Sequence, residues 1–240
     1  MSTEHHIIVS GIAVEIDRKD IKNLHLGVYP PNGRVRVAAP LAVSDEAIRL
    51  AVIGKLGWVK RQRLKFQNQP RQSARQMVSG ETHFFLGKAY RLKVEIAQRG
   101  QISLRGSRHL VLNCHADKSI AQKERILHQW YRKQLRAIVD ELLQKWQPAL
   151  NVTPSFCGIR KMKTRWGSCN TQTGRIWLNL ELAKKSPQCI EYIVVHELIH
   201  LLERHHNERF MALMDLHLGN WRVLRDELNQ GMLAQEEWRY

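Results

Sequence analysis

Hydrophobic and polar residues alternate with a period of two near the start of the chain, which is the pattern of β-strands. Across residues 7–40 this pattern predicts short strands over residues 9–16, 24–28 and 34–37. Pro30-Pro31-Asn32-Gly33 precedes the last of them, and these residue types favour a turn. The beginning of the chain is therefore expected to be rich in β-structure.

Two helices are predicted next, because apolar residues recur there with helical spacing. One spans residues 44–66, and Ser44 is a favourable N-cap for it. The other spans residues 119–146, and Pro148 is expected to end it. Between these helices the pattern predicts a polar loop and two strands, over residues 67–80, 84–96 and 102–113.

Beyond residue 150 the pattern predicts a short sheet and three helices. A connection containing Gly167 joins the two strands, and the first of the helices is apolar on most of its circumference, as a buried helix is. The predicted elements are strands over residues 155–162 and 175–180, a helix after Ser186-Pro187, a helix from about residue 208 to Gly219, and a helix over residues 222–230.

These elements predict an α+β fold in two parts. Residues 1–115 form a β-rich, basic N-terminal region with one helix, and residues 116–240 form the second domain. That domain holds a supporting helix, a short sheet, a buried helix and a further helix. The sequence shows no internal repeat and no low-complexity tract.

Composition bounds the cellular setting. No run of about 18 apolar residues exists, and the first residues lack the pattern of a signal peptide. We therefore expect a cytoplasmic protein without membrane contact. The four cysteines are widely spaced with no Cys-x-x-Cys pair, so they are interpreted as reduced packing residues.

The formal net charge of +16 is unevenly distributed along the chain. Residues 1–80 and 81–150 carry +7 each, whereas residues 151–240 carry only +2. This balance favours an anionic partner that contacts residues 1–150, and nucleic acid is the most common candidate. A solvated basic surface that only aids solubility explains the charge equally well, and the sequence leaves both interpretations open.

His196-Glu197-Leu198-Ile199-His200 lies within the buried helix and has the spacing of a catalytic metal site. Residues four apart lie on one helix face, about 5.4 Å apart along the axis, so both imidazoles can bind one Zn²⁺. Glu197 can then act as general base toward water that the metal activates. A third ligand is needed, and His206 is close enough in sequence for the chain to bring it back. Without a metal, buried histidines and an acid would be costly.

Four segments of the chain resemble the YgjP-like family of zinc metallopeptidases, which is related to the SprT-like proteases. The segments are Lys163-Thr164-Arg165-Trp166-Gly167-Ser168-Cys169, Ile176-Trp177-Leu178-Asn179, His196 to His200, and His206 to Phe210. Their order and spacing match over residues 155–230, and the β-rich beginning is also similar to the family's. The resemblance implies a minimal zincin-like metallopeptidase fold in the second domain.

The resemblance also implies roles for individual residues. His196, His200 and His206 correspond to the metal ligands, and Glu197 corresponds to the catalytic glutamate. His205 is the local rival of His206 as ligand. Glu203, on the same helical face as His196, is interpreted as a structural or supporting acid rather than a fourth ligand.

The segment around Cys169 admits several interpretations. Arg165 and Ser168 are candidates to line the cleft and hold substrate, and Asn179 is a third candidate whose alternative role is a turn or cap. Gly167 is expected to allow a close approach or an unusual dihedral angle. Nothing indicates that Cys169 is a nucleophile. The donor for the oxyanion is not identified, with Tyr192 and the Arg165 region as candidates.

The sequence therefore predicts a zinc-dependent peptidase with one Zn²⁺ per chain, acting on protein or peptide substrates. Association with nucleic acid through the basic residues 1–150 is part of this hypothesis. Two alternatives stay open. One is a non-catalytic nucleic-acid-binding protein with a structural metal, and the other is a small-peptide or amide hydrolase without a nucleic-acid link. Oligomeric state and cleavage specificity are not readable from the sequence.

Overall fold

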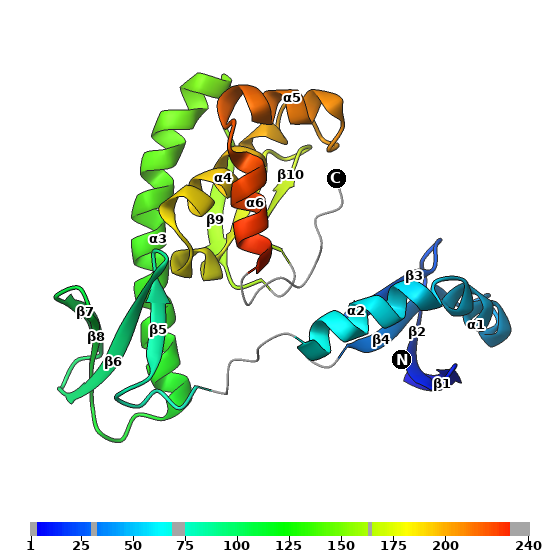
Figure 1. Ribbon diagram of the computed structural model, residues 1–240, viewed down its shortest axis with the longest axis horizontal. Helices are drawn as coiled ribbons and strands as arrows, with labels where there is room; N and C mark the ends of the chain where they lie inside the picture. Colours follow the sequence, from blue (N-terminus) through cyan, green and yellow to red (C-terminus); the bar gives the residue numbers. More distant parts are fainter. Residues whose placement is uncertain (1–3, 30–32, 69–74, 163–164, 231–240) are drawn as a thin grey trace. The chain divides into compact units, whose positions relative to one another are not determined.

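In a computed structural model the chain divides into two compact units, Met1–Arg71 and Gln72–Tyr240 (Figure 1). The boundary predicted between residues 115 and 116 falls inside the second unit. The α+β class with a β-rich N-terminal region is confirmed. The structure describes residues 4–29, 33–68, 75–162 and 165–230. Most of the predicted turn at Pro30-Pro31-Asn32-Gly33 lies outside these residues.

The first unit contains a four-stranded sheet with the strand order β1-β2-β4-β3. The β2–β4 pair is parallel and the two outer pairs are antiparallel. Alternate residues of these strands are buried against two helices, as a sheet with one covered face requires. The elements are β1 (Glu4–Val9), β2 (Ile12–Lys19), β3 (His25–Tyr29), β4 (Arg34–Pro40), α1 (Asp45–Gly54) and α2 (Leu56–Asn68).

The helix predicted over residues 44–66 is two helices that break at Lys55. Ser44 caps α1 as expected, since its side chain accepts a hydrogen bond from the backbone N–H of Ala47 at 3.3 Å. The Lys55 backbone N–H bonds to Val52, the tight hydrogen bond of a last helical turn. Gly54 beside it weakens the helix at this point.

Two hairpins replace single predicted strands. The strand predicted over residues 9–16 contains the last residue of β1, a turn at Ser10 and Gly11, whose φ angles are 50° and 77°, and the first part of β2. The strand predicted over residues 84–96 is β5 and β6 with a turn at Leu86 and Gly87, at 47° and 78°. Positive φ at both central residues is typical of the tight type I′ hairpin turn.

The second unit begins with a sheet of order β5-β6-β8-β7, which repeats the topology of the first unit. In both sheets the central pair is parallel, the outer pairs are antiparallel, and a helix capped by serine follows. The sequence shows no internal repeat, so this repetition is visible only in the structure. The strands are β5 (Thr82–Phe85), β6 (Lys88–Ile96), β7 (Gln101–Arg105) and β8 (His109–Cys114).

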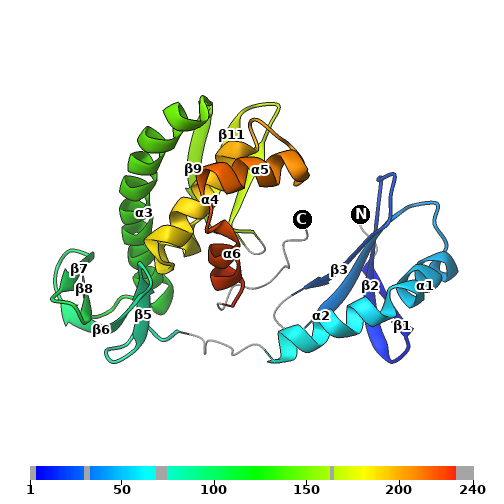
Figure 2. The same cartoon turned by 45° about the horizontal axis from the view of Figure 1, so that its top comes forward.

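The long helix α3 (Ile120–Leu150) packs against both sheets of the second unit (Figure 2). Ser119 and Gln122 form a reciprocal capping box at its start. The helix continues through Pro148, which was expected to end it. It ends instead at Asn151, whose φ of 52° turns the chain while the Val152 N–H bonds back to Gln147 at 3.1 Å.

A three-stranded sheet of order β10-β11-β9 and the remaining helices complete the second unit. The pair β9–β11 is parallel, and β10, which sequence analysis had placed in a connection, pairs antiparallel with β11 at the sheet edge. No described helix is long and apolar enough to cross a membrane. The elements are β9 (Phe156–Arg160), β10 (Gly167–Asn170), β11 (Arg175–Asn179), the 3₁₀ helix η1 (Leu180–Lys184), α4 (Pro187–Ile199), α5 (Glu208–His217) and α6 (Trp221–Gln230).

The hairpin turn between β5 and β6 contacts the start of α4. The backbone N–H groups of Leu86 and Gly87 donate to the carbonyls of Ala183 and Lys184 in η1, at 2.9 and 3.2 Å. A Cβ atom added to Gly87 would lie 3.3 Å from Cα of Ser186, the N-cap of α4. The second sheet is therefore attached directly to the helix that carries His196 and Glu197.

Candidate metal centre

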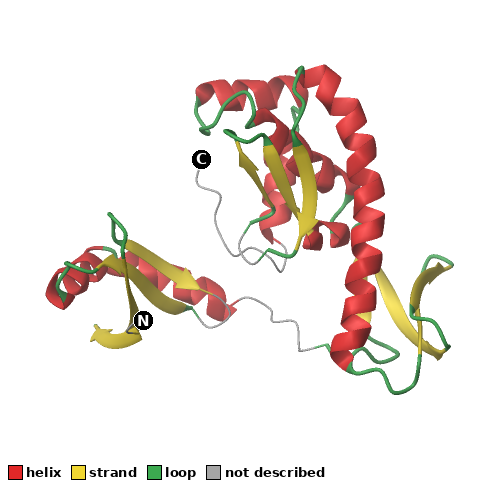
Figure 3. Cartoon of the chain, turned by 180° about the vertical axis from the view of Figure 1, so that it is seen from behind, coloured by secondary structure: helices red, strands yellow, loops and turns green. Residues whose placement is uncertain are grey.

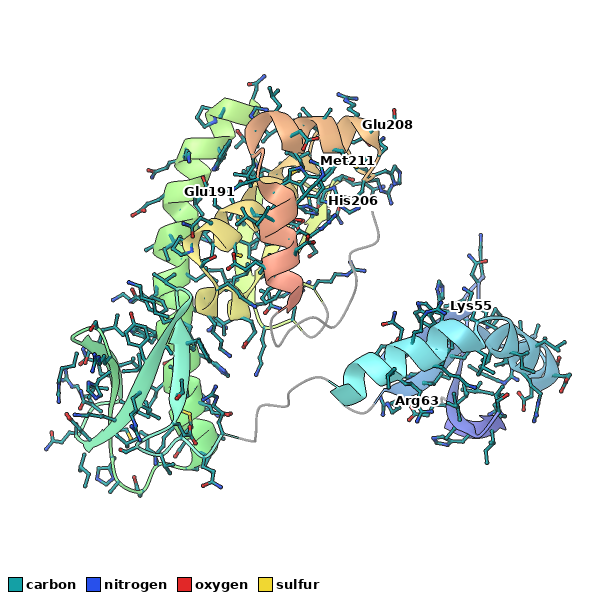
Figure 4. The ribbon with its side chains drawn as sticks, in the orientation of Figure 1. Lys55, Arg63, Glu191, His206, Glu208 and Met211 are labelled. Atoms are coloured by element: carbon teal, nitrogen blue, oxygen red, sulfur yellow. The ribbon has the colours of Figure 1, made fainter. Side chains whose placement is uncertain are left out.

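Helix α4 holds His196 and Glu197 in the core, where each is 1% exposed. Ser186 caps the helix by accepting a hydrogen bond from the Cys189 backbone N–H at 3.4 Å. On its more exposed side, the Glu191 carboxylate accepts hydrogen bonds from Lys145 and Trp146 of α3, at 2.7 and 2.8 Å (Figure 4). Burial and these bonds fix the orientation of the helix.

His196, His200 and His206 bring one ring nitrogen each to within 4.8 Å of one another. Nε2 of His196 and Nε2 of His206 lie 3.2 Å apart. Two nitrogen ligands of a tetrahedral zinc ion, each about 2.0–2.1 Å from the metal, lie about 3.3 Å apart. His206 lies in the turn before α5 (Figure 4), whereas His205 is exposed and lies outside this group. The three side chains fit a zinc ion.

His200 is oriented by a backbone carbonyl. Its Nδ1 lies 3.1 Å from the carbonyl oxygen of Glu203, to which an Nδ1–H donates, so that Nε2 keeps its lone pair for a metal. The Glu203 carboxylate accepts a hydrogen bond from the His205 backbone N–H at 3.2 Å and lies 3.9 Å from Arg209. Glu203 thus stabilises the turn that brings His206 back to α4.

All three imidazoles are held neutral. Burial lowers the pKa of His196 well below its usual value, and the neighbouring His200 and His206 lower it further. Burial also lowers the pKa of His200, and it lowers the pKa of His206 to about 4. Neutral imidazoles can bind a metal without first releasing a proton.

The aromatic ring of Phe210 forms the apolar wall of the centre. It is fully buried in α5, and its centroid lies 5.0, 4.9 and 4.7 Å from the rings of His196, His200 and His206. Tyr192, one turn before His196, packs edge to face with that histidine, and their ring centroids lie 5.8 Å apart. The rings of the three ligands are therefore confined by packing as well as by hydrogen bonds.

The Glu197 carboxyl is buried in the same helix, one residue after His196. Burial raises its pKa to about 8, and the positive charge of Arg165 opposes this rise. Its Oε2 atom makes no hydrogen bond to any described residue. A buried carboxyl oxygen without a protein partner has room to interact with a ligand of the site, such as water.

Gly167 lies against the side chain of Glu197. A Cβ atom added to Gly167 would lie 2.7 Å from Cγ and 2.8 Å from Cδ of Glu197, closer than real contacts allow. Because β10 lacks a side chain here, the carboxyl of the helix can reach the strand. Sequence analysis expected a close approach at Gly167, and its partner is Glu197.

The side chain of Asn179 is buried, and the protein's own backbone uses its amide group. Its Nδ2 donates to the carbonyls of Met162 and Arg165 at 3.1 and 2.7 Å, while its Oδ1 accepts from the N–H groups of Met162 and Glu181 at 3.2 Å. Its backbone N–H donates to Trp166 at 2.8 Å. Asn179 therefore anchors the segment that leads into β10.

Asn179→Asp is expected to lower the free energy of unfolding by about 2–5 kcal/mol, because two buried carbonyls lose their donors and face a carboxyl oxygen instead. Urea unfolding measures the change. Asn170→Asp is the matched control, since the Oδ1 of Asn170 accepts from two backbone N–H groups and a carboxylate can do the same. An equal effect of both substitutions would contradict the anchoring role of Asn179.

Arg165 and Ser168, the other two candidates for contact with substrate, have different surroundings in the structure. Arg165 is exposed, and its charge acts on Glu197. Ser168 pairs with Trp177 across β10 and β11, and alternation along the strand places it on the face opposite to Gly167. Ser168 therefore stands on the sheet face that points away from α4.

The thiols of Cys157, Cys169 and Cys189 have raised pKa values. Burial raises the pKa of Cys169 to about 12, and the carboxyl of Glu197 adds to this rise. Burial also raises the pKa of Cys157 and of Cys189 to about 11. Thiols in this state are poor nucleophiles, so these cysteines act as packing residues.

Comparisons with known proteins place this site in a family. The model of the YgjP-like metallopeptidase domain matches residues 22–231. The metallopeptidase zymogen abylysin of Pyrococcus abyssi is 22% identical, over 38% of this chain and 91% of its own, with a TM-score of 0.35. The zymogen jannalysin of Methanocaldococcus jannaschii is 24% identical, over 40% and 94%, with a TM-score of 0.34. No curated protein matches. The chain belongs to the YgjP-like metallopeptidase family.

Proposed function

We propose that this metallopeptidase holds one Zn²⁺ on His196, His200 and His206 and hydrolyses peptide bonds with Glu197 as general base. The observation that carries the proposal is the convergence of three neutral imidazoles, together with a buried carboxyl on the same helix that keeps one oxygen without a described partner. Three histidines form a donor set that zinc uses in catalytic sites.

The residues of the chain divide the chemical work. When bound, zinc supplies Lewis acidity toward water and toward the carbonyl of the scissile bond. Glu197 takes a proton from the attacking water at Oε2 and returns it to the leaving amine. Its burial raises the pKa toward neutrality, which suits a group that must both accept and donate a proton.

The edge strand β10 supports a peptide as the substrate. β10 pairs with β11 on one side only, so its other side offers backbone donors and acceptors to an extended chain. Gly167 at the start of β10 lies against Glu197, so a peptide paired there would run past the catalytic carboxyl. Arg165, exposed just before this strand, is the candidate for contact with the substrate.

The net charge of +16 supports a second part of the proposal, action near nucleic acid. The basic residues of 1–150 supply most of this charge. Several lie on or just before α2: Lys60 and Arg61 are exposed on this helix, and Lys55, labelled in Figure 4, is exposed in the turn before it. A peptidase whose charge has no partner is the alternative, and salt-dependent binding of DNA distinguishes the two.

Metal content tests the proposed centre. Wild-type protein reconstituted with zinc is expected to hold about one ion per chain, and His200→Ala is expected to lose most of it, because two ligands seldom retain zinc. Mass spectrometry of the metal measures both. His205→Ala is the matched control, since His205 is adjacent but exposed. Full zinc occupancy in His200→Ala would disprove the ligand set.

A further inference from the structure

The face of the three-stranded sheet that points away from α4 carries two aromatic rings and two arginine side chains that lie over them. In Figure 3 this sheet lies in front of the helices of its unit. Phe156 of β9 and Trp177 of β11 meet here with their ring centroids 5.0 Å apart. A Cβ atom added to Gly158 would lie 2.5 Å from one ring and 2.6 Å from the other, so the rings lie over this glycine. Phe156 remains 39% exposed.

Two arginines lie on these rings. The guanidinium of Arg160 is 4.8 Å from the ring centroid of Trp177, and that of Arg175 is 4.8 Å from the ring centroid of Phe156. Within the described residues, no carboxylate forms an ion pair with Arg160 or Arg175. Residues 151–180 contain five Lys and Arg residues and no Asp or Glu. We name Phe156, Arg160, Arg175 and Trp177 the aromatic–arginine platform.

The outer face of the first unit's sheet shows the alternative arrangement. There Arg34 lies 3.3 Å from Glu15, and Arg36 lies 2.6 Å from Asp17. Those arginines are neutralised within the sheet. The platform arginines rest on aromatic rings instead, so their charge remains available to an anion that also has flat surfaces.

We propose that the aromatic–arginine platform binds single-stranded nucleic acid. Exposed bases stack on aromatic and guanidinium planes, and phosphates pair with the arginines. A duplex offers phosphates but keeps its base faces stacked inside, so it should bind less well. The inference rests on the nucleic-acid part of the proposed function and assigns the stacking contact to the metallopeptidase unit. The basic residues 1–150 then contribute long-range attraction.

The platform and the contact between Gly167 and Glu197 lie on opposite faces of the same sheet. Gly167 faces Glu197 on one side of the sheet, while Ser168 stands beside Trp177 on the other. Nucleic acid bound to the platform would therefore lie on one face of the sheet, whereas Glu197 lies on the other face, next to β10, along which we place the peptide substrate. This arrangement would hold the enzyme on nucleic acid while the metal centre faces proteins nearby.

Fluorescence anisotropy of the zinc-loaded full chain with a labelled oligo(dT) tests the proposal. Arg160→Ala/Arg175→Ala is expected to weaken binding at least tenfold. The α2 variant, Lys55→Ala/Lys60→Ala, removes the same charge from α2 and the turn before it, and is expected to weaken binding less than threefold. Phe156→Leu changes no charge and is expected to weaken it at least threefold, because a stacking surface is lost. Thermal melts and zinc content confirm that each variant is folded.

Three outcomes would overturn the inference. A larger loss from the α2 variant would place the contact in the first unit. Unchanged binding by Phe156→Leu, or equal affinity for a duplex, would mean that charge alone attracts DNA. Displacement of oligo(dT) by poly-glutamate at equal charge would point to an acidic protein instead. Peptide hydrolysis without DNA is measured separately, so an inactive protein that binds as expected refutes the catalytic proposal alone.

Discussion

Glu197→Gln is expected to lower kcat for peptide hydrolysis by about 10²–10⁴-fold, the contribution typical of a general base. The amide has the shape of the carboxyl but cannot accept the proton of the attacking water. The side chain does not belong to the group of candidate ligands, so the variant should bind zinc as wild type does. KM is expected to change little, because the substrate contacts remain.

Steady-state assays with a quenched fluorescent peptide library measure kcat and KM. Metal analysis of the same samples measures their zinc content. Glu208→Gln is the matched control, because Glu208 is exposed at the start of α5, two residues from His206 (Figure 4). It should retain the wild-type rate. If Glu197→Gln hydrolyses peptides at the wild-type rate with zinc bound, Glu197 is not the base.

Gly167→Ala is expected to lower kcat by about tenfold to a hundredfold, with zinc content unchanged. The added methyl group occupies the place of the Glu197 side chain, whose Cγ and Cδ would lie at 2.7 and 2.8 Å. The carboxyl must move, and displacement of a catalytic group by about 1 Å can cost a hundredfold in rate. Gly167 is thus a positioning residue that acts through Glu197.

Two further variants separate positioning from general damage to the sheet. Gly158→Ala creates a comparable clash, with Phe156 and Trp177, on the sheet face away from Glu197, and it should affect stability more than kcat. In a Glu197→Asp background the shorter side chain leaves room for the methyl group, so Gly167→Ala should have a smaller effect on kcat. Equal effects in both backgrounds would contradict the positioning role.

The helices and the group of three histidines follow from local sequence patterns. Ser186-Pro187 begins α4, its apolar circumference predicts burial, and the spacing of His196 and His200 places them on one helix face. His206 was selected without knowledge of the turn after α4, and the structure brings its Nε2 to 3.2 Å from His196. Where consecutive residues carry the information, the sequence is sufficient.

The features that sequence analysis missed depend on pairing between distant segments. The hairpin turns at Ser10-Gly11 and Leu86-Gly87 lie inside largely apolar stretches of sequence. Each stretch therefore looks like one continuous strand in the sequence. The repeated topology appears only when strand order is known. β10 is short and polar, and its pairing with β11 makes it a strand.

The direction of side chains was equally hidden. Asn179 was a candidate for substrate contact, but its position at the end of β11 turns its amide into the loop before β10. Ser168 stands on the far face because Gly167 occupies the near one. The net charge of +2 on the last third conceals residues 151–180, which contain no Asp or Glu.

The two sheets of repeated topology differ in what their first hairpin turn contacts. In the second copy the turn at Gly87 donates hydrogen bonds to η1 and lies against Ser186, so this sheet supports the first turn of the helix that carries His196 and Glu197. At Gly11, the equivalent turn of the first copy, an added Cβ would meet no described atom within 4 Å. The turn of the second copy must therefore keep both its backbone angles and its fit to Ser186, whereas the turn of the first copy has only its backbone angles to keep.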